Sequence, residues 1–243
     1  MKNLPSSTKR AFSLIETVIA IGVLAVLLTG FMIVFAPAAA GIKKSISAQE
    51  ADRLASTLEQ ELVTSRGSDP TPGFNKAFEW LKAANVAETA LLVYQYRGDL
   101  SSNRTDGTPV PMADVTNKRP GVDYAVISMV RRKNDALFTD DMTAVEGGVY
   151  LAKCTQLVFD TNGQLTAGTA GQIKNPKPNI PADPNYKAGP FNSSNDYPEA
   201  VIAFSAEFYS IPGKRPGYFQ NAFATNFPNL KNPVFTRNLA VRR

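Results

Sequence analysis

The sequence offers few residues that could perform chemistry, and it lacks the commonest kinds of enzyme site. Histidine is absent and Cys154 is the single cysteine. The commonest general base, the commonest metal ligand and every His-dependent triad are therefore missing. One cysteine cannot form an intrachain disulfide, and Cys154 lies in a strand-like stretch, where a small core residue is expected. With no paired nucleophile and no cofactor fingerprint, we predict that the protein is not an enzyme and binds no cofactor.

A small acidic cluster is the one place where a metal ion could bind. Asp140, Asp141 and Glu146 supply carboxylate oxygens, which calcium prefers as ligands. Their spacing matches no ligand pattern, so a solvated turn is the expected interpretation and a calcium site is the alternative. We predict no metal ligands.

The net charge of +5 does not indicate a nucleic-acid-binding protein. Lys2, Lys9 and Arg10 lie in the first ten residues, which leaves 23 of the 26 basic residues against 21 acidic ones. A net charge of +2 for the remainder provides no electrostatic footprint for a phosphate backbone, and no nucleic-acid partner is predicted.

A long apolar stretch dominates the first part of the chain. Residues 17–42 contain no ionisable side chain over 26 positions, whereas a membrane span needs only about 20. The stretch is too long for the apolar region of a secretory signal. It predicts a transmembrane helix over about residues 17–40.

One carboxylate stands at the edge of this stretch. Glu16 directly precedes it, and an isolated carboxylate entering a bilayer costs a few kcal/mol unless it is paired or neutralised. Glu16 therefore needs a cationic partner; the alternative is a side chain that snorkels to the interface.

The residues around Glu16 resemble a known processing signal. The segment Lys9-Arg10-Ala11-Phe12-Ser13-Leu14-Ile15-Glu16, with the apolar helix behind it, resembles the prepilin cleavage and methylation site of type IV pilins and type II secretion pseudopilins. The resemblance covers residues 9 to about 40. The family usually has glycine where this chain has Ala11, which is also small.

The resemblance implies a specific maturation and assembly route. A prepilin peptidase would remove a leader of residues 1–11 by cutting between Ala11 and Phe12, and would then methylate the new Phe12 amine. Glu16 would neutralise that amine on an adjacent subunit during assembly. The implied location is the inner membrane, with a single span, a cytoplasmic leader and an extracytoplasmic remainder that later enters a filament.

A proline interrupts the apolar stretch near its end. Pro37 removes one helical hydrogen bond and predicts a kink; in the family such a breaker is associated with local melting in the filament. The alternative is that proline is simply commoner in membrane helices.

The second half of the expected helix, which runs over residues 12–66, is amphipathic. Its apolar residues recur at helical spacing and predict one buried stripe: Ala51, Leu54, Ala55, Leu58 and Leu62. The helix is expected to end near Arg66-Gly67 and to pack this stripe on a sheet.

Residues 67–243 predict a globular domain built on an antiparallel sheet. A short helix is expected over 74–84, with strands over 91–96, 124–131, 149–159, 200–211 and 234–241. In the fourth strand, Ile202, Phe204, Ala206 and Phe208 alternate with more polar residues, which suits one buried and one solvated face. Long loops are expected over 97–122 and 161–198. The fold class is α+β: a long N-terminal helix packed on an antiparallel sheet, in the pilin-like arrangement that the resemblance implies.

These observations predict a structural subunit of a type IV pilus or a type II secretion pseudopilus. The 232 residues that follow the expected leader are long for a repetitive major subunit, so a minor subunit is favoured. The expected partners are prepilin peptidase, other pilin or pseudopilin subunits and the inner membrane. The alternative is a membrane-anchored extracytoplasmic binding module that does not polymerise.

Overall fold

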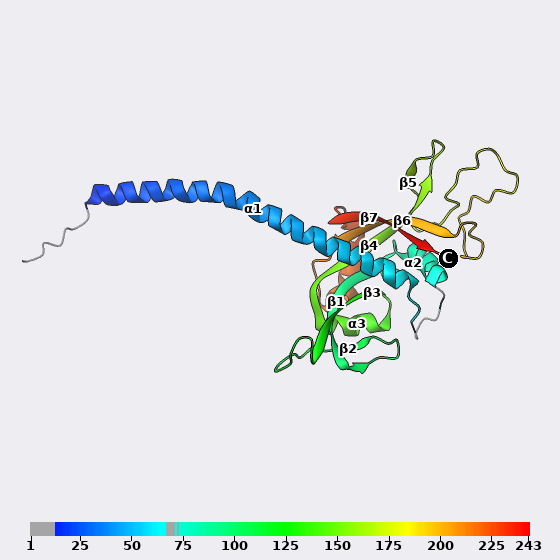
Figure 1. The fold of residues 1–243 in the computed structure, drawn as a ribbon, viewed down its shortest axis with the longest axis horizontal. Helices are drawn as coiled ribbons and strands as arrows, with labels where there is room; N and C mark the ends of the chain where they lie inside the picture. The colour runs from blue at the N-terminus through cyan, green and yellow to red at the C-terminus, as the bar shows by residue number, and fades with distance from the viewer. Residues whose placement is uncertain (1–12, 67–70, 72) are drawn as a thin grey trace, which may run out of the picture. The chain divides into compact units, whose positions relative to one another are not determined.

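The structure is a computed structural model that describes residues 13–66, 71 and 73–243 (Figure 1). It divides into two units, residues 1–48 and 49–243. Helix α1 (Leu14–Val63) runs through the boundary between them. The helix ends three residues before the predicted Arg66, and its helical assignment continues through Pro37.

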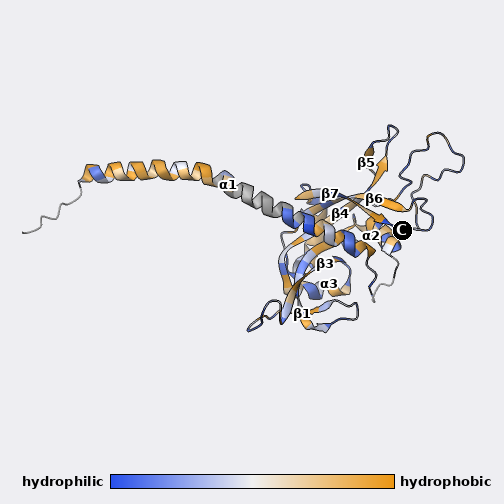
Figure 2. Ribbon diagram, viewed as in Figure 1, coloured by the Kyte–Doolittle hydropathy of each residue, from blue (hydrophilic) through white to orange (hydrophobic). Residues whose placement is uncertain are grey.

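The described part of the first unit is apolar. Figure 2 shows an almost continuous hydrophobic colour over Leu14–Phe35, the portion of α1 with a mean hydropathy of 2.8 over its most apolar 18 residues. Its large apolar side chains are between 54% and 86% exposed.

The second unit contains one seven-stranded sheet in which every strand pairing is antiparallel. The main path runs β2-β1-β4-β6-β7, while β3 pairs with β1 and β5 pairs with β4. The strands are β1 (Leu91–Asn103), β2 (Pro109–Pro111), β3 (Tyr124–Arg132), β4 (Val145–Phe159), β5 (Leu165–Ala167), β6 (Val201–Ser210) and β7 (Phe235–Arg242). The predicted α+β class with an antiparallel sheet is confirmed.

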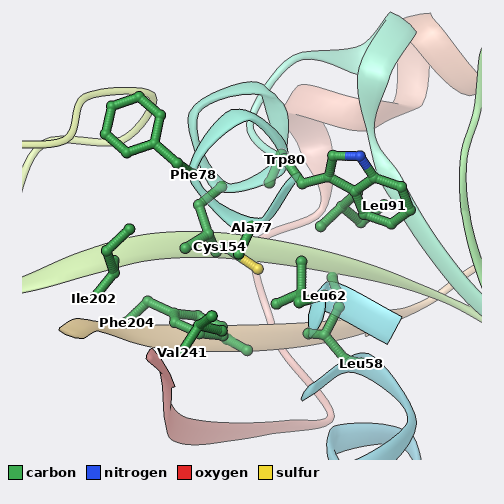
Figure 3. Packing of buried hydrophobic residues seen from close by; sticks show 14 of the residues in the cluster. Leu58, Leu62, Ala77, Phe78, Trp80, Leu91, Cys154, Ile202, Phe204 and Val241 are labelled. Atoms are coloured by element: carbon green, nitrogen blue, oxygen red, sulfur yellow. The ribbon is translucent and has the colours of Figure 1, made fainter. Parts of the chain in front are cut away.

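The helical part of α1 that lies in the second unit packs on one face of this sheet. Leu54, Ala55, Leu58 and Leu62 are buried, as the helical spacing predicted. They share a core cluster with α2 (Gly73–Ala83) and with alternate residues of the strands (Figure 3). Cys154 lies in this cluster, which confirms its prediction as a core residue. Four large residues are fully or almost fully buried around it: Phe78, Leu91, Ile202 and Phe204.

The other face of the sheet is also covered, which the alternation in β6 did not predict. Tyr209 belongs to the set that alternates with Ile202, Phe204, Ala206 and Phe208, for which a solvated face was expected, but it is 6% exposed. It joins a second cluster with Leu92, Tyr94 and Phe138. The cover comes from short elements that were not predicted: α3 (Ala136–Asp141), α4 (Pro216–Asn221), α5 (Phe223–Asn226) and the 3₁₀ turns η1 (Ala87–Thr89), η2 (Met142–Ala144) and η3 (Phe227–Asn229). These elements are too short to give a readable helical period.

The two expected loops are more ordered than their compositions indicated. β1 continues seven residues past the predicted Tyr96, and β2 and β5 form inside the expected loops. The second loop also contributes Ile173, Phe191 and Tyr197 to the core beside α2. The Gln156 side chain holds this loop at both backbone groups of Lys174, accepting from its N–H at 2.7 Å and donating to its carbonyl at 2.8 Å.

Candidate functional site

The apolar portion of α1 is long enough and apolar enough to cross a membrane. It spans Leu14–Phe35, or 22 residues, and none of its most apolar stretch is buried within the protein. The two threonine hydroxyls in it are satisfied by the carbonyls one turn earlier: Thr17 Oγ1 donates to the Ser13 carbonyl and Thr29 Oγ1 donates to the Ala25 carbonyl. This is the arrangement that lipid requires, because a hydrocarbon environment offers polar groups no partner.

Glu16 lies in the first turn of this helix. α1 begins at Leu14, and Ser13 Oγ accepts a hydrogen bond from the Ile15 backbone N–H at 3.3 Å. A carboxylate in the first turn is favoured by the helix dipole. Among the described residues, Glu16 forms no ion pair, and its side chain is exposed.

The other residues named for processing and assembly fall in two places. Ala11 and Phe12 lie outside the described residues. Pro37 lies inside α1, where it is exposed and the helix is assigned without a break. The kink expected at Pro37 stays a prediction.

The acidic cluster is not a solvated turn. Asp141 is completely buried, while Asp140 and Glu146 are exposed and face different cations. Glu146 pairs with Arg97 at 3.2 Å, and Asp140 pairs with Arg104 at 3.5 Å. Among the described residues, no group of three acidic, histidine or cysteine side chains is arranged to hold a metal ion.

Asp141 belongs to a buried charge network centred on Arg131. The guanidinium of Arg131 donates to Asp141 Oδ2 and to Asp106 Oδ2, both at 2.8 Å. It also reaches Asp135 Oδ2 at 3.3 Å. Asp141 accepts two further bonds at 2.6 Å, from Tyr94 Oη and from Arg104 Nη1. The network ties α3 and residues 104–108 to the sheet.

The environment of this network favours its charged groups. Burial alone would lower the pKa of Arg131, but the negative charge of Asp141 and the hydrogen bonds to Asp106 and Asp141 raise it. Burial, followed by the charge of Asp141, raises the pKa of Tyr94 well above its ordinary value. Arg131 therefore remains a cation and Tyr94 a neutral hydrogen-bond donor. The guanidinium of Arg131 therefore supplies a positive charge beside Asp141, the buried member of the acidic cluster.

The sequence contains one signal for this network. Arg131 lies on the same face of β3 as Ile127 and Met129, two residues that pack in the second core cluster. A charged residue that shares the buried face of a strand with apolar residues indicates a buried ion pair, because burying an unpaired charge is too costly. Its partners cannot be read in the same way, since they lie in loops and in a short helix.

A second buried ion pair, between Lys76 and Glu61, lies at the C-terminal end of α1. Lys76 is 2% exposed and donates to the carbonyls of Glu61 and Thr64 at 2.9 and 2.8 Å. It also pairs with Glu61 Oε1 at 2.8 Å, and Arg66 binds the same carboxylate through Nε at 2.9 Å. The hydrogen bond to Glu61 raises the pKa of Arg66. Lys76 thus binds the backbone carbonyls at and just beyond the end of α1, where main-chain acceptors lack helical N–H partners.

The thiol of Cys154 is expected to be inert in the folded protein. Its side chain is 1% exposed, and burial raises its pKa to about 12. At pH 8 a thiol-specific aromatic disulfide should therefore leave the native protein unmodified, since the thiolate is the reactive form. In guanidinium chloride the same reagent should report one thiol per chain. Rapid labelling of the native protein would contradict the burial of Cys154.

The described residues therefore present an exposed apolar helix with one acidic first-turn residue, joined to a domain whose buried charges are mutually paired. Comparison with protein-family models, with curated proteins and with solved structures found no match.

Proposed function

We propose that this protein is a subunit, and specifically a minor subunit, of a type IV pilus or a type II secretion pseudopilus. In this proposal prepilin peptidase cuts between Ala11 and Phe12 on the cytoplasmic side of the inner membrane and methylates the Phe12 amine. The processed chain then leaves the membrane as its apolar helix packs among the helices of other pilin or pseudopilin subunits. The pilin-like character of the fold is part of the same proposal.

The observation that carries the proposal is Glu16, the single acidic residue at the start of an exposed apolar helix. Residues 17–42 hold no charge that could pair with it. In lipid an unpaired carboxylate costs a few kcal/mol, and an amine brought close to it removes most of that cost. Cleavage before Phe12 would create such an amine four residues from Glu16. On a neighbouring helix shifted along the membrane normal, that amine can meet the carboxylate.

The arrangement of the second unit is compatible with this role. Leu54, Leu58 and Leu62 bury the last part of α1 in the core of the second unit, so this part of the helix belongs to the folded domain. Apolar side chains of Leu14–Phe35 remain available for lipid before assembly and for other helices after it. Helices in lipid associate through packing rather than through a hydrophobic driving force, so Gly22 and Gly30 would permit close approach.

The amino terminus of the mature protein provides the direct test. Mass spectrometry of the protein from its own membranes is expected to show N-methylated Phe12 and no residue before it. A protein that keeps Met1 and the leader, in cells with active prepilin peptidase, would favour the non-polymerising membrane-anchored module instead.

The role of Glu16 is tested by a substitution that removes its negative charge and changes little else in the side chain. Glu16→Gln keeps the size and polarity of the side chain, so we expect normal membrane insertion and cleavage but at least a tenfold loss of incorporation into sheared filaments. The expected loss follows from about 1.4 kcal/mol or more of lost pairing in an apolar environment. Thr17→Val is a matched control one residue away, and its incorporation should match that of the unaltered protein. Equal incorporation of Glu16→Gln would remove the assembly role of this residue.

A further inference from the structure

β7 forms an open edge of the sheet. Among the described residues it pairs only with β6, over the full register from Val201↔Arg242 to Phe208↔Phe235 (Figure 1). This register has no bulge, and β7 contains no proline. Natural sheets usually protect such edges with bulges, prolines or charges, because a free edge is a template for another strand.

The direction of the hydrogen bonds identifies which backbone groups are free. The Arg243 N–H donates to the Ala200 carbonyl at 2.8 Å, and the register continues from this pair into the strands. In an antiparallel ladder, hydrogen-bonded and non-hydrogen-bonded pairs alternate. The odd-numbered residues of β7 therefore face β6. The N–H and C=O groups of four residues point away from it: Thr236, Asn238, Ala240 and Arg242. All four residues are exposed.

The opposite edge of the sheet is less accessible. At β3 the Gly121 N–H donates to the Tyr124 carbonyl at 2.8 Å, so a turn engages the first residue of that strand. Towards its other end, Val130 and Arg131 are 1% and 3% exposed. Strand addition is therefore favoured at β7 rather than at β3.

The charges on β7 indicate what kind of strand fits. Residues 234–243 contain three arginines and no acidic residue. The Arg242 side chain has no hydrogen-bond or ion-pair partner among the described residues. Arg237 pairs with Asp52, but both side chains are more than half exposed, and such a pair contributes little. A basic strand would be repelled here, and an acidic one attracted.

We propose that β7 binds an extended acidic segment of a partner protein as an additional strand of the sheet. The partner's backbone would bond to the four outward-facing residues of β7, which is the mode known as β-augmentation. Arg237 and Arg242 are five positions apart and point to opposite faces of the sheet. The segment would therefore carry acidic residues on both of its faces, separated by an odd number of positions.

The test uses the full chain in detergent micelles and a labelled peptide. The probe is a capped ten-residue peptide of alternating valine and threonine, with two glutamates placed five positions apart. Its control has lysines in place of the glutamates. We expect fluorescence anisotropy to show binding of the acidic peptide at least tenfold tighter than binding of the basic one, and weakening of that binding at high salt.

Two variants separate backbone pairing from charge. Ala240→Pro removes an outward N–H and no bond to β6, and proline is tolerated at such an edge position. It should weaken binding of the acidic peptide about tenfold, through loss of one or two hydrogen bonds. Arg242→Glu should shift the preference towards the basic peptide. Neither variant should change the Tm by more than a few degrees, and Arg242→Glu keeps the test decisive if Ala240→Pro fails to fold.

Several results would overturn the proposal. Equal binding of the two peptides would exclude recognition of acidic residues, and binding that Ala240→Pro leaves unchanged would exclude pairing at β7. Dimerisation of the full chain that Ala240→Pro abolishes, without binding of either peptide, would assign the edge to a second copy of this chain.

Discussion

Replacing Arg131 with methionine is expected to lower the free energy of unfolding of the second unit by about 3–5 kcal/mol. The guanidinium is 3% exposed and bonds to Asp106 and Asp141, whose side chains are fully buried. Methionine fills a similar volume but leaves these carboxylates with less compensation for their lost hydration. In a thermal melt of the full chain in detergent, the change corresponds to a decrease in Tm of roughly 6–20 °C.

The control for Arg131 is an exposed arginine with a similar partner. Arg119 pairs with Asp123 at 3.6 Å and its side chain is 74% exposed. Arg119→Met should therefore cost less than about 1 kcal/mol. Adding Asp106→Asn to Arg131→Met should recover part of the lost stability, because it removes one of the two uncompensated charges. A loss of under 1 kcal/mol for Arg131→Met would show that the network contributes no more than a surface pair.

Replacing Leu58 with alanine is expected to lower the free energy of unfolding of the second unit by about 2–5 kcal/mol. Leu58 is fully buried between α1 and the sheet, close to Leu62 (Figure 3), and it shares its core cluster with Leu54. Truncation removes apolar contacts and leaves a cavity that a sheet-backed core cannot easily close. Denaturant unfolding followed by tryptophan fluorescence is suitable, because Trp80, the single tryptophan, belongs to the same cluster.

Two substitutions in the same helix define the specificity of this effect. Glu59→Ala changes an exposed neighbour and should alter the stability by no more than about 0.5 kcal/mol. Leu27→Ala is chemically identical to Leu58→Ala but affects a side chain that is 65% exposed. It should leave unfolding of the second unit unchanged. Equal losses for Leu27→Ala and Leu58→Ala would contradict the assignment of the buried stripe to the second half of α1.

Local patterns in the sequence were sufficient for the elements with a strong period. Leu54, Leu58 and Leu62 recur with the period of a helix, and Ile202 and Phe204 alternate with the period of a strand. Such periods report which side chains share a face, and that property depends only on neighbouring residues. The apolar stretch could be recognised equally well, because the absence of charge over many consecutive positions is a local feature.

The burial of the second face of the sheet could not be predicted from such local patterns. Tyr209 alternates correctly with its neighbours, but the elements that cover it come from residues 136–144 and 216–229. Whether a face is covered depends on where distant short segments settle. Six-residue helices contain under two turns, which is too little for a recognisable period.

The amino-acid sequence by itself determined the apolar helix, the position of Glu16 at its start and the alternation that builds the strands. Only the tertiary structure decided that Asp141 is buried against Arg131 while its neighbour Asp140 is exposed, and that β7 lies at an open edge. The reason is the range of the interactions concerned. Helical and strand periods arise from adjacent turns and pleats, whereas ion pairs and strand order join residues that are distant in the chain and meet only when the sheet assembles.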